Sequence, residues 1–246
     1  MTARVLVVGA AGRMGRAVIE AAAGRSDVAI AGGVDKGDAA AALLDACDVY
    51  VDFSTPQATR EVAQLATAKQ RAAVIGTTGL GADDEAALAA LAKVAPVVVA
   101  ANFSLGVNVV LGLARQVANI LGPDWDAEIV ETHHSKKRDA PSGTALAIAR
   151  SIAAGRGVDY DAVKRHTRDG DVGPRPRGEI GVMSLRGGDV VGEHVATFYG
   201  AGERIELGHR ATSRSIFAVG ALRAAAWVVG KPPGRYTMLD VLGLSP

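Results

Sequence analysis

Residues 131–144 carry the densest group of side chains that could do chemistry. His133 and His134 are followed closely by the basic run 136–138, between an expected strand end and an expected helix start. Histidine exchanges protons near neutral pH, and lysine supplies a fixed positive charge or a proton. The segment therefore predicts an acid–base site with a cation beside it.

The helix start just beyond this segment offers a place for an anion. Ser142, Gly143 and Thr144 fall in its first turn, where N–H groups and hydroxyls can hold a carboxylate. Each feature also has a plainer interpretation: a structural histidine, a solvated basic run, or Ser142 as a helix cap. We find no convergent carboxylate or cysteine ligands beside the histidine pair, so we expect no metal site.

A glycine-rich turn near the beginning of the chain predicts a dinucleotide site. Gly9, Gly12 and Gly15 separate a short apolar strand from a helix, where backbone N–H groups and the helix dipole can meet a pyrophosphate. Asp35 closes the second strand, where a carboxylate can bind ribose hydroxyls. Lys36 could pair with the extra phosphate of NADPH or be an ordinary exposed lysine. The pair suggests tolerance of NADH and NADPH.

The elements that must position these residues fall into two patterns. Strands and helices alternate up to about residue 101, which favours a Rossmann-type, doubly wound parallel sheet of the α/β class. Consecutive strands later in the chain favour a second, α+β domain with a mixed or antiparallel sheet. We expect a dinucleotide-binding domain from 1–104 and 214–246, and a substrate-binding and oligomerisation domain from 105–213.

Composition excludes several other classes. The 246 residues include 27 basic and 26 acidic ones, a formal charge of +1 that points to neither nucleic acid nor membrane as a partner. The single cysteine, Cys47, allows no disulfide within the chain. The first apolar run is too short for a signal peptide, and we expect no membrane helix. A cytoplasmic location is therefore expected.

The chain resembles the 4-hydroxy-tetrahydrodipicolinate reductase family, also called dihydrodipicolinate reductase. The most specific match is Glu131-x-His-His-x-x-Lys137-x-Asp-Ala-Pro-Ser-Gly-Thr144. Further matches run in order along nearly the whole chain: Gly9-Ala-Ala-Gly-Arg-Met-Gly15, Asp52-Phe-Ser-Thr55, Gly76-Thr-Thr-Gly79, Ala101-Asn-Phe-Ser104, Arg186-Gly-Gly188, Val191-Gly-Glu-His194, Arg214 and Met238-Leu-Asp-Val-Leu-Gly243.

The resemblance implies a reaction and a set of roles. The family uses NADH or NADPH to reduce 4-hydroxy-tetrahydrodipicolinate to tetrahydrodipicolinate in lysine (diaminopimelate) biosynthesis, and it is typically tetrameric. His133 would donate or accept the proton, Lys137 would be the second catalytic group, and the substrate would contact His134, Ser142, Gly143 and Thr144. The cofactor would contact Gly9, Ala10, Ala11, Gly12, Arg13, Met14, Asp35, Lys36, Gly76, Thr77, Thr78, Ala100, Ala101, Asn102 and Phe103.

One departure and three alternatives stand beside this interpretation. The connection 36–47 is shorter than in many family members, which affects the adenosine contacts. Tyr160 and Lys164 match the spacing of the catalytic pair of short-chain dehydrogenases. Cys47 could be the nucleophile of an aldehyde dehydrogenase, although a buried small residue is the commoner role. A non-catalytic NAD(P)H sensor would bind cofactor without turnover.

Overall fold

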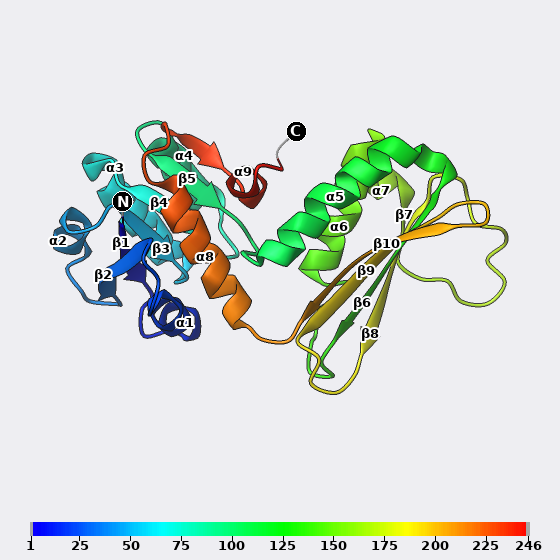
Figure 1. Cartoon of the computed structure of the whole chain (residues 1–246), viewed down its shortest axis with the longest axis horizontal. Helices are drawn as coiled ribbons and strands as arrows, with labels where there is room; N and C mark the ends of the chain where they lie inside the picture. The colour runs from blue at the N-terminus through cyan, green and yellow to red at the C-terminus, as the bar shows by residue number, and fades with distance from the viewer. Residues whose placement is uncertain (1, 245–246) are drawn as a thin grey trace. The chain divides into compact units, whose positions relative to one another are not determined.

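The computed structural model describes residues 2–244, and these form two compact units (Figure 1). The first unit comprises the described residues up to Leu105 and those from Ser215 onward, and the second comprises Gly106–Arg214. Each unit has its own hydrophobic core.

The first unit is built on a six-stranded sheet in which every paired strand is parallel. The order β11-β5-β4-β3-β1-β2 reverses direction beside β1, which creates a switch point at its carboxyl end. The expected Rossmann-like class is confirmed. The strands are β1 Ala3–Val8, β2 Val28–Val34, β3 Val49–Asp52, β4 Ala72–Ile75, β5 Pro96–Val99 and β11 Gly234–Tyr236.

Helices cover both faces of this sheet, so its central strands are apolar on both sides. Val5 and Val7 of β1 face one core cluster, whereas Leu6 and Val8 face the other. The first face is covered by α1 Arg13–Ala22, α8 Ser215–Val228 and α9 Met238–Leu242. The second is covered by α2 Ala40–Asp45, α3 Pro56–Lys69 and α4 Ala82–Ala92.

The second unit is built on a mixed five-stranded sheet of order β10-β9-β6-β8-β7. Strand β6 pairs antiparallel with β9 and parallel with β8, as expected for an α+β unit. The strands are β6 Asp126–His133, β7 Lys164–Arg165, β8 Ile180–Arg186, β9 Gly192–Tyr199 and β10 Arg204–Ala211. The helices are α5 Leu105–Leu121, α6 Gly143–Arg156, α7 Tyr160–Val163 and the short 3₁₀ turn η1 Gly122–Asp124.

Helices α5 and α6 cover one face of this mixed sheet. Val110 and Ala114 of α5 pack in the same core as Ile148 of α6 and Ile129 of β6. By length and composition alone, the segment Leu105–Asp124 could cross a membrane, contrary to our expectation of no such helix. The core helix of a soluble protein meets the same criterion, and α5 has one face in the core.

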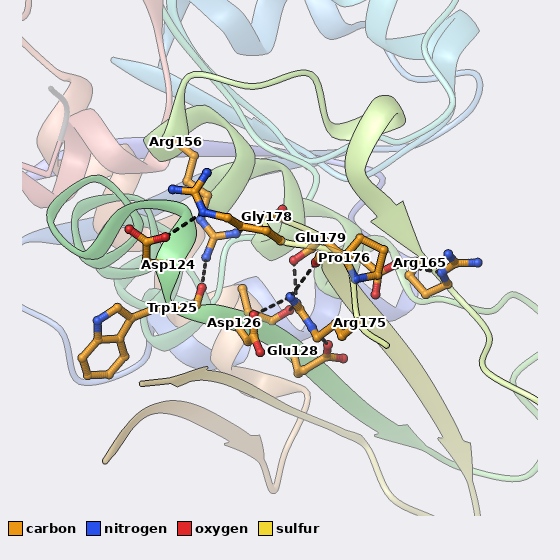
Figure 2. Close-up of polar contacts among 12 residues, drawn as sticks. Asp124, Trp125, Asp126, Glu128, Arg156, Arg165, Arg175, Pro176, Gly178 and Glu179 are labelled. Atoms are coloured by element: carbon orange, nitrogen blue, oxygen red, sulfur yellow. Dashed lines mark hydrogen bonds and ion pairs between the residues drawn. The ribbon is translucent and has the colours of Figure 1, made fainter. Parts of the chain in front are cut away.

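The long segment 165–179, which leads from β7 to β8, is held against the sheet by arginines. It begins with β7, which pairs with β8. The guanidinium of Arg175 contacts Asp126 Oδ1 at 2.6 Å and Glu128 Oε1 at 2.9 Å, and it donates to the carbonyl of Glu179 (Figure 2). This network fixes the segment at the end of β6 that lies away from His133.

Candidate active site

The expected cofactor residues gather at one edge of the first unit. They follow the carboxyl ends of β1, β2, β4 and β5, which lie at the same edge of the parallel sheet as its switch point. Ligands of open parallel sheets bind in this crevice. The topology therefore brings together the glycine turn after β1, Asp35 after β2, and the segments 76–78 and 100–103.

The glycines of the first turn are required by close backbone approach. Gly9 has a φ of +78°, which favours glycine. A Cβ on Gly15 would lie 2.1 Å from the carbonyl oxygen of Gly9, so α1 can pack against the turn only with glycine there. Helix α1 begins at Arg13, and no described side chain caps its N-terminus. These features fit a pyrophosphate on the helix N-terminus.

Asp35 is tied to this turn. Its two carboxylate oxygens lie 3.1 and 3.0 Å from the donating backbone nitrogen of Ala11. The neighbouring Lys36 is exposed. Both residues line a cavity of about 850 Å³ that extends from Gly9 and Gly12 toward α3. The cavity has the size expected for a cofactor half-site.

A second, smaller hollow shares Phe53 with the first. Its volume is about 230 Å³. The ring of Phe53 packs edge-on against Phe103, with centroids 5.7 Å apart. The lining of this hollow is Met14, Phe53, Gly76, Ala101, Asn102, Phe103 and Phe217.

A buried aspartate connects two of the segments at this edge. Asp52 Oδ1 accepts from the backbone N–H of Ser54 at 2.9 Å and from the hydroxyl of Thr77 at 3.1 Å. Burial raises the pKa of Asp52, and the hydrogen bonds from Ser54 and Thr77 oppose that rise. The carboxyl thus fixes the position of expected cofactor residue Thr77.

We expect Gly15→Ala to weaken dinucleotide binding by about 10- to 100-fold, because the new methyl must displace the turn. Overpacking of this kind costs about 1–3 kcal/mol, and each 1.4 kcal/mol is about tenfold in affinity. Calorimetric titration with NADH measures the change. Gly32→Ala is the matched control, since its Cβ would meet only side chains at 3.6 Å. Equal affinity for NADH in the two variants would contradict the prediction that this glycine turn binds the dinucleotide.

In the second unit, His133 is the last residue of β6 and is 9 % exposed. Its Nδ1 lies 2.6 Å from Oε2 of Glu131, which is fully buried. The two residues are two positions apart, so they point to the same face of the strand. A Cβ on Gly192 would lie 2.9 Å from His133 Nε2, so glycine there leaves room for the ring.

Glu131 is held by two further donors. Arg186 of β8 makes two contacts of 2.9 Å, one to each carboxylate oxygen, and the backbone N–H of Ser142 donates to Oε1 at 3.0 Å. Burial would raise the pKa of Glu131, but hydrogen bonds from Arg186, His133, Ser184 and Ser142 outweigh it and lower the pKa to about 2. The carboxylate is therefore ionised at neutral pH.

His194 of β9 lies on the other side of His133. The two rings meet edge to face with centroids 5.2 Å apart. Burial, together with the nearby charge of His133, lowers the pKa of His194 to about 4, so its ring is neutral near pH 7. Its Nε2 lies 3.1 Å from the hydroxyl of Ser142.

Ser142 has a structural role in the helix that follows. It is the N-cap of α6, and its hydroxyl accepts from the backbone N–H of Ala145 at 3.2 Å. Its own N–H is held by Glu131. The expected substrate residue Ser142 thus has both groups engaged within the protein, while Gly143 is exposed at the first position of the helix.

A turn brings Lys137 back after the strand. The backbone N–H of Lys137 donates to the carbonyl of His134 at 3.1 Å. Its ammonium lies 2.9 Å from Asp139 Oδ1, and the side chain is 20 % exposed. The positive charge of Lys137 contributes to the lowered pKa of His194. Lys137 therefore lies close enough to His194 for its charge to act on that ring.

The alternative sites are arranged for other roles. The hydroxyl of Tyr160 lies 2.8 Å from His166 Nε2, and Lys164 pairs with Asp161, so each side chain has another polar partner. Cys47 is buried, and burial raises the pKa of its thiol to about 11, which makes it a poor nucleophile. Residues 2–244 contain no group of ligands suited to a metal ion.

The ion pairs of Glu131 predict a loss of stability in acid. Its pKa is about 2 in the folded chain against an ordinary 4.5. A lowered pKa stabilises the fold above the ordinary value, and this stabilisation is lost as the pH falls toward the folded value. We expect Glu131 to account for about 2 kcal/mol of the unfolding free energy lost between about pH 6 and about pH 3.

Urea unfolding at several pH values tests this expectation. The Glu131→Gln variant should be less stable at neutral pH and should lose less stability in acid than the parent chain. Glu193→Gln is the matched control, because that carboxylate is partly exposed on the neighbouring strand. Identical acid dependence in Glu131→Gln and the parent would show that Glu131 is not held as described.

Comparison with known proteins identifies the family. A parallel sheet with a glycine turn at its switch point, followed in the chain by a mixed-sheet unit, is the architecture of a two-unit dinucleotide-binding protein. Residues 3–103 match the family profile described as dihydrodipicolinate reductase, N-terminus, and residues 106–242 match the profile for its C-terminus. The chain belongs to the 4-hydroxy-tetrahydrodipicolinate reductase family, NAD(P)H-dependent oxidoreductases of lysine biosynthesis.

Individual relatives agree over their whole length. The 4-hydroxy-tetrahydrodipicolinate reductase of Geobacter metallireducens is 45% identical, covering 98% of this chain and 99% of the relative. The enzyme of the same name from Alkalilimnicola ehrlichii is 46% identical, covering 99% and 100%. Their alignments span 263 and 267 positions, more than the 246 residues here, so these relatives carry segments that this chain lacks.

Solved structures show the same fold. Dipicolinate-bound dihydrodipicolinate reductase from Paenisporosarcina sp. TG-14 superposes with a TM-score of 0.79 at 24% identity, covering 98% of this chain and 99% of that one. A diaminopimelate dehydrogenase of C. glutamicum gives a TM-score of 0.55 at 15% identity, covering 100% and 97%. These likenesses concern the fold.

Proposed function

We propose that this chain reduces 4-hydroxy-tetrahydrodipicolinate to tetrahydrodipicolinate with NADH or NADPH, and that the 4-hydroxyl of the ring leaves as water. The observation that carries the proposal is the cluster at the end of β6, where His133 is held by a buried carboxylate and Lys137 returns in the next turn. Family membership supplies the substrate class, and the cluster supplies the groups that its reduction needs. The Paenisporosarcina reductase, whose solved structure has dipicolinate bound, supports a cyclic dicarboxylate as the substrate.

The chemistry requires a proton, a cation and an anion site. The nicotinamide cofactor supplies hydride, which places negative charge on the ring. Lys137 stabilises that charge as a positioned cation, and His133 supplies the proton that completes the reduction. His134, together with Gly143 and Thr144 in the first turn of α6, holds a substrate carboxylate, and Ser142 caps that helix.

The cofactor binds to the first unit in this proposal. Gly9, Ala10, Ala11, Gly12, Arg13 and Met14 meet the pyrophosphate, Asp35 and Lys36 meet the adenosine ribose, and the nicotinamide side is formed by Gly76, Thr77, Thr78, Ala100, Ala101, Asn102 and Phe103. An acidic Asp35 next to an exposed Lys36 supports use of both NADH and NADPH. The ratio of kcat/KM for the two cofactors measures this preference.

The direct test is an assay with substrate made in situ from pyruvate and aspartate semialdehyde by the preceding synthase. Oxidation of NADH or NADPH that depends on both precursors and on this chain supports the proposal. Cofactor binding without oxidation would refute it and would favour a non-catalytic sensor. Omission of the synthase is the control for turnover on either precursor alone.

We also propose a cytoplasmic homotetramer assembled through the mixed sheet. The face of this sheet opposite α5 and α6 exposes Val130, Leu185 and Tyr199, which are 42 %, 54 % and 44 % exposed. Apolar side chains gathered on one sheet face favour association. Light scattering on the purified chain measures the assembly, and a monomer mass would refute it.

A further inference from the structure

Glu131 is the most completely held ionisable side chain of the second unit. Both carboxylate oxygens accept at least two hydrogen bonds, and the residue is fully buried between β8 and β9. Arg186 meets the carboxylate with two parallel donors, a geometry that fixes its orientation as well as its position. The guanidinium is anchored in turn by the carbonyl of Asp139 at 2.7 Å.

This arrangement decides which nitrogen of His133 carries a proton. An ionised carboxylate can only accept hydrogen bonds, so Nδ1 must donate to Glu131 across their 2.6 Å contact. Nε2 is left as the nitrogen that exchanges a proton with the substrate. Gly192 leaves space beside that nitrogen, because any side chain there would press on the ring.

We infer that Glu131 is a positioning residue for the reduction, holding His133 in the tautomer and orientation from which Nε2 delivers the proton, with Arg186 as its anchor. The inference rests on the proposed function and deepens it. The imidazolium of His133 gives its Nε2 proton to the reduced ring and becomes neutral while Nδ1 keeps its proton. A proton from solvent then restores the imidazolium.

The other charged groups around His133 would not replace Glu131. His194 is neutral near pH 7, and Lys137 and Arg186 are cations, so none of the three supplies a negative charge. Glu131 is therefore the negative charge in contact with the ring. The titratable and charged groups facing the pair are Lys137 and Asp139 from the turn, Arg186 from β8, His194 from β9 and, behind His194, His209 from β10.

Glu131→Gln tests the inference because it keeps the shape and removes the charge. Its amide would set an N–H against either His133 Nδ1 or a donor of Arg186. We expect kcat near neutral pH to fall about 100-fold and its alkaline decline to begin at lower pH, with the KM for NADH unchanged. Glu193→Gln is the matched control. An unchanged kcat and pH profile would overturn the inference while leaving the reductase assignment intact.

Nitrogen-15 NMR of the chain with labelled histidines reports which ring nitrogen of His133 carries a proton, and it needs no turnover. The chain has five histidines, and His133→Asn assigns the signal of His133. In alkaline solution, where imidazoles are neutral, we expect the Nδ1–H tautomer of His133 in the parent chain, retained in Glu193→Gln and lost in Glu131→Gln. An Nε2–H tautomer in the parent would overturn the inference, even if reductase activity is absent and the proposed function fails separately.

Glu131→Asp covers the case in which Glu131→Gln does not fold. The shorter carboxylate keeps its charge for Arg186 but withdraws from Nδ1. We expect an intermediate loss of kcat, about 10-fold, together with partial loss of the Nδ1–H signal. Full activity with a displaced carboxylate would overturn the inference.

Discussion

His133→Asn should lower kcat by about 10²- to 10⁴-fold, the usual contribution of a positioned acid–base group. Asparagine can keep a hydrogen bond to Glu131 but cannot exchange a proton near neutral pH. The affinity for NADH should be unchanged, because the expected cofactor residues belong to the other unit. Steady-state kinetics with calorimetric cofactor titration separates the two effects.

A matched histidine controls for this replacement. His166 hydrogen-bonds Tyr160 in the second unit and takes no part in the cluster around Glu131. His166→Asn should retain kcat within about threefold of the parent, a difference of less than 1 kcal/mol in activation free energy. If His133→Asn turns over as fast as His166→Asn, another group supplies the proton.

Lys137→Met should lower kcat by about 10²- to 10³-fold, the effect of removing one group that stabilises charge in a transition state. Methionine keeps most of the apolar length of the side chain and removes the ammonium. The partner carboxylate of Asp139 is 64 % exposed, and ion pairs that water reaches contribute at most about 1 kcal/mol. The variant should therefore fold normally, as thermal unfolding would show.

The adjacent lysine is the control for Lys137. Lys136 is exposed in the same turn, so Lys136→Met removes the same charge one residue away. We expect Lys136→Met to retain kcat. Equal losses in both variants would mean that the net charge of the turn, rather than the position of Lys137, drives the effect.

The fold class followed from sequence pattern because the pattern has a direct physical cause. Apolar runs such as 4–8, each followed by helical periodicity, require a parallel sheet covered on both faces. Strand β11 was not predicted, because Gly234–Tyr236 is a three-residue edge strand after a proline pair. Helix α2 was also missed, since the alanine-rich run Ala40–Asp45 has no capping side chain.

The candidate site was predictable only where its residues are close in sequence. His133, His134 and Lys137 stand together, and their types alone indicate acid–base chemistry. The contact of Glu131 with His133 was missed. The sequence carried a signal for it, because Ala127, Ile129, Glu131 and His133 alternate along one strand, and a carboxylate on that buried face indicates a polar partner.

Partners from other strands were beyond sequence reasoning. Arg186 and His194 reach Glu131 and His133 through the register of β8 and β9 with β6. Register depends on long-range pairing, and a slip of one residue would turn these side chains to the other face. Asp52 was recognised only as part of a motif. Its hydrogen bonds from Ser54 and Thr77 depend on the parallel pairing of β3 with β4.

The central claim is that hydride passes from a nicotinamide to a cyclic dicarboxylate on this protein. The most direct measurement uses NADH carrying deuterium at the transferable position of its ring, with substrate made in situ, and follows the product by mass spectrometry. We predict a tetrahydrodipicolinate heavier by a single deuterium, formed in step with cofactor oxidation. Oxidation without label in the product, or labelled cofactor left unconsumed, would contradict the account.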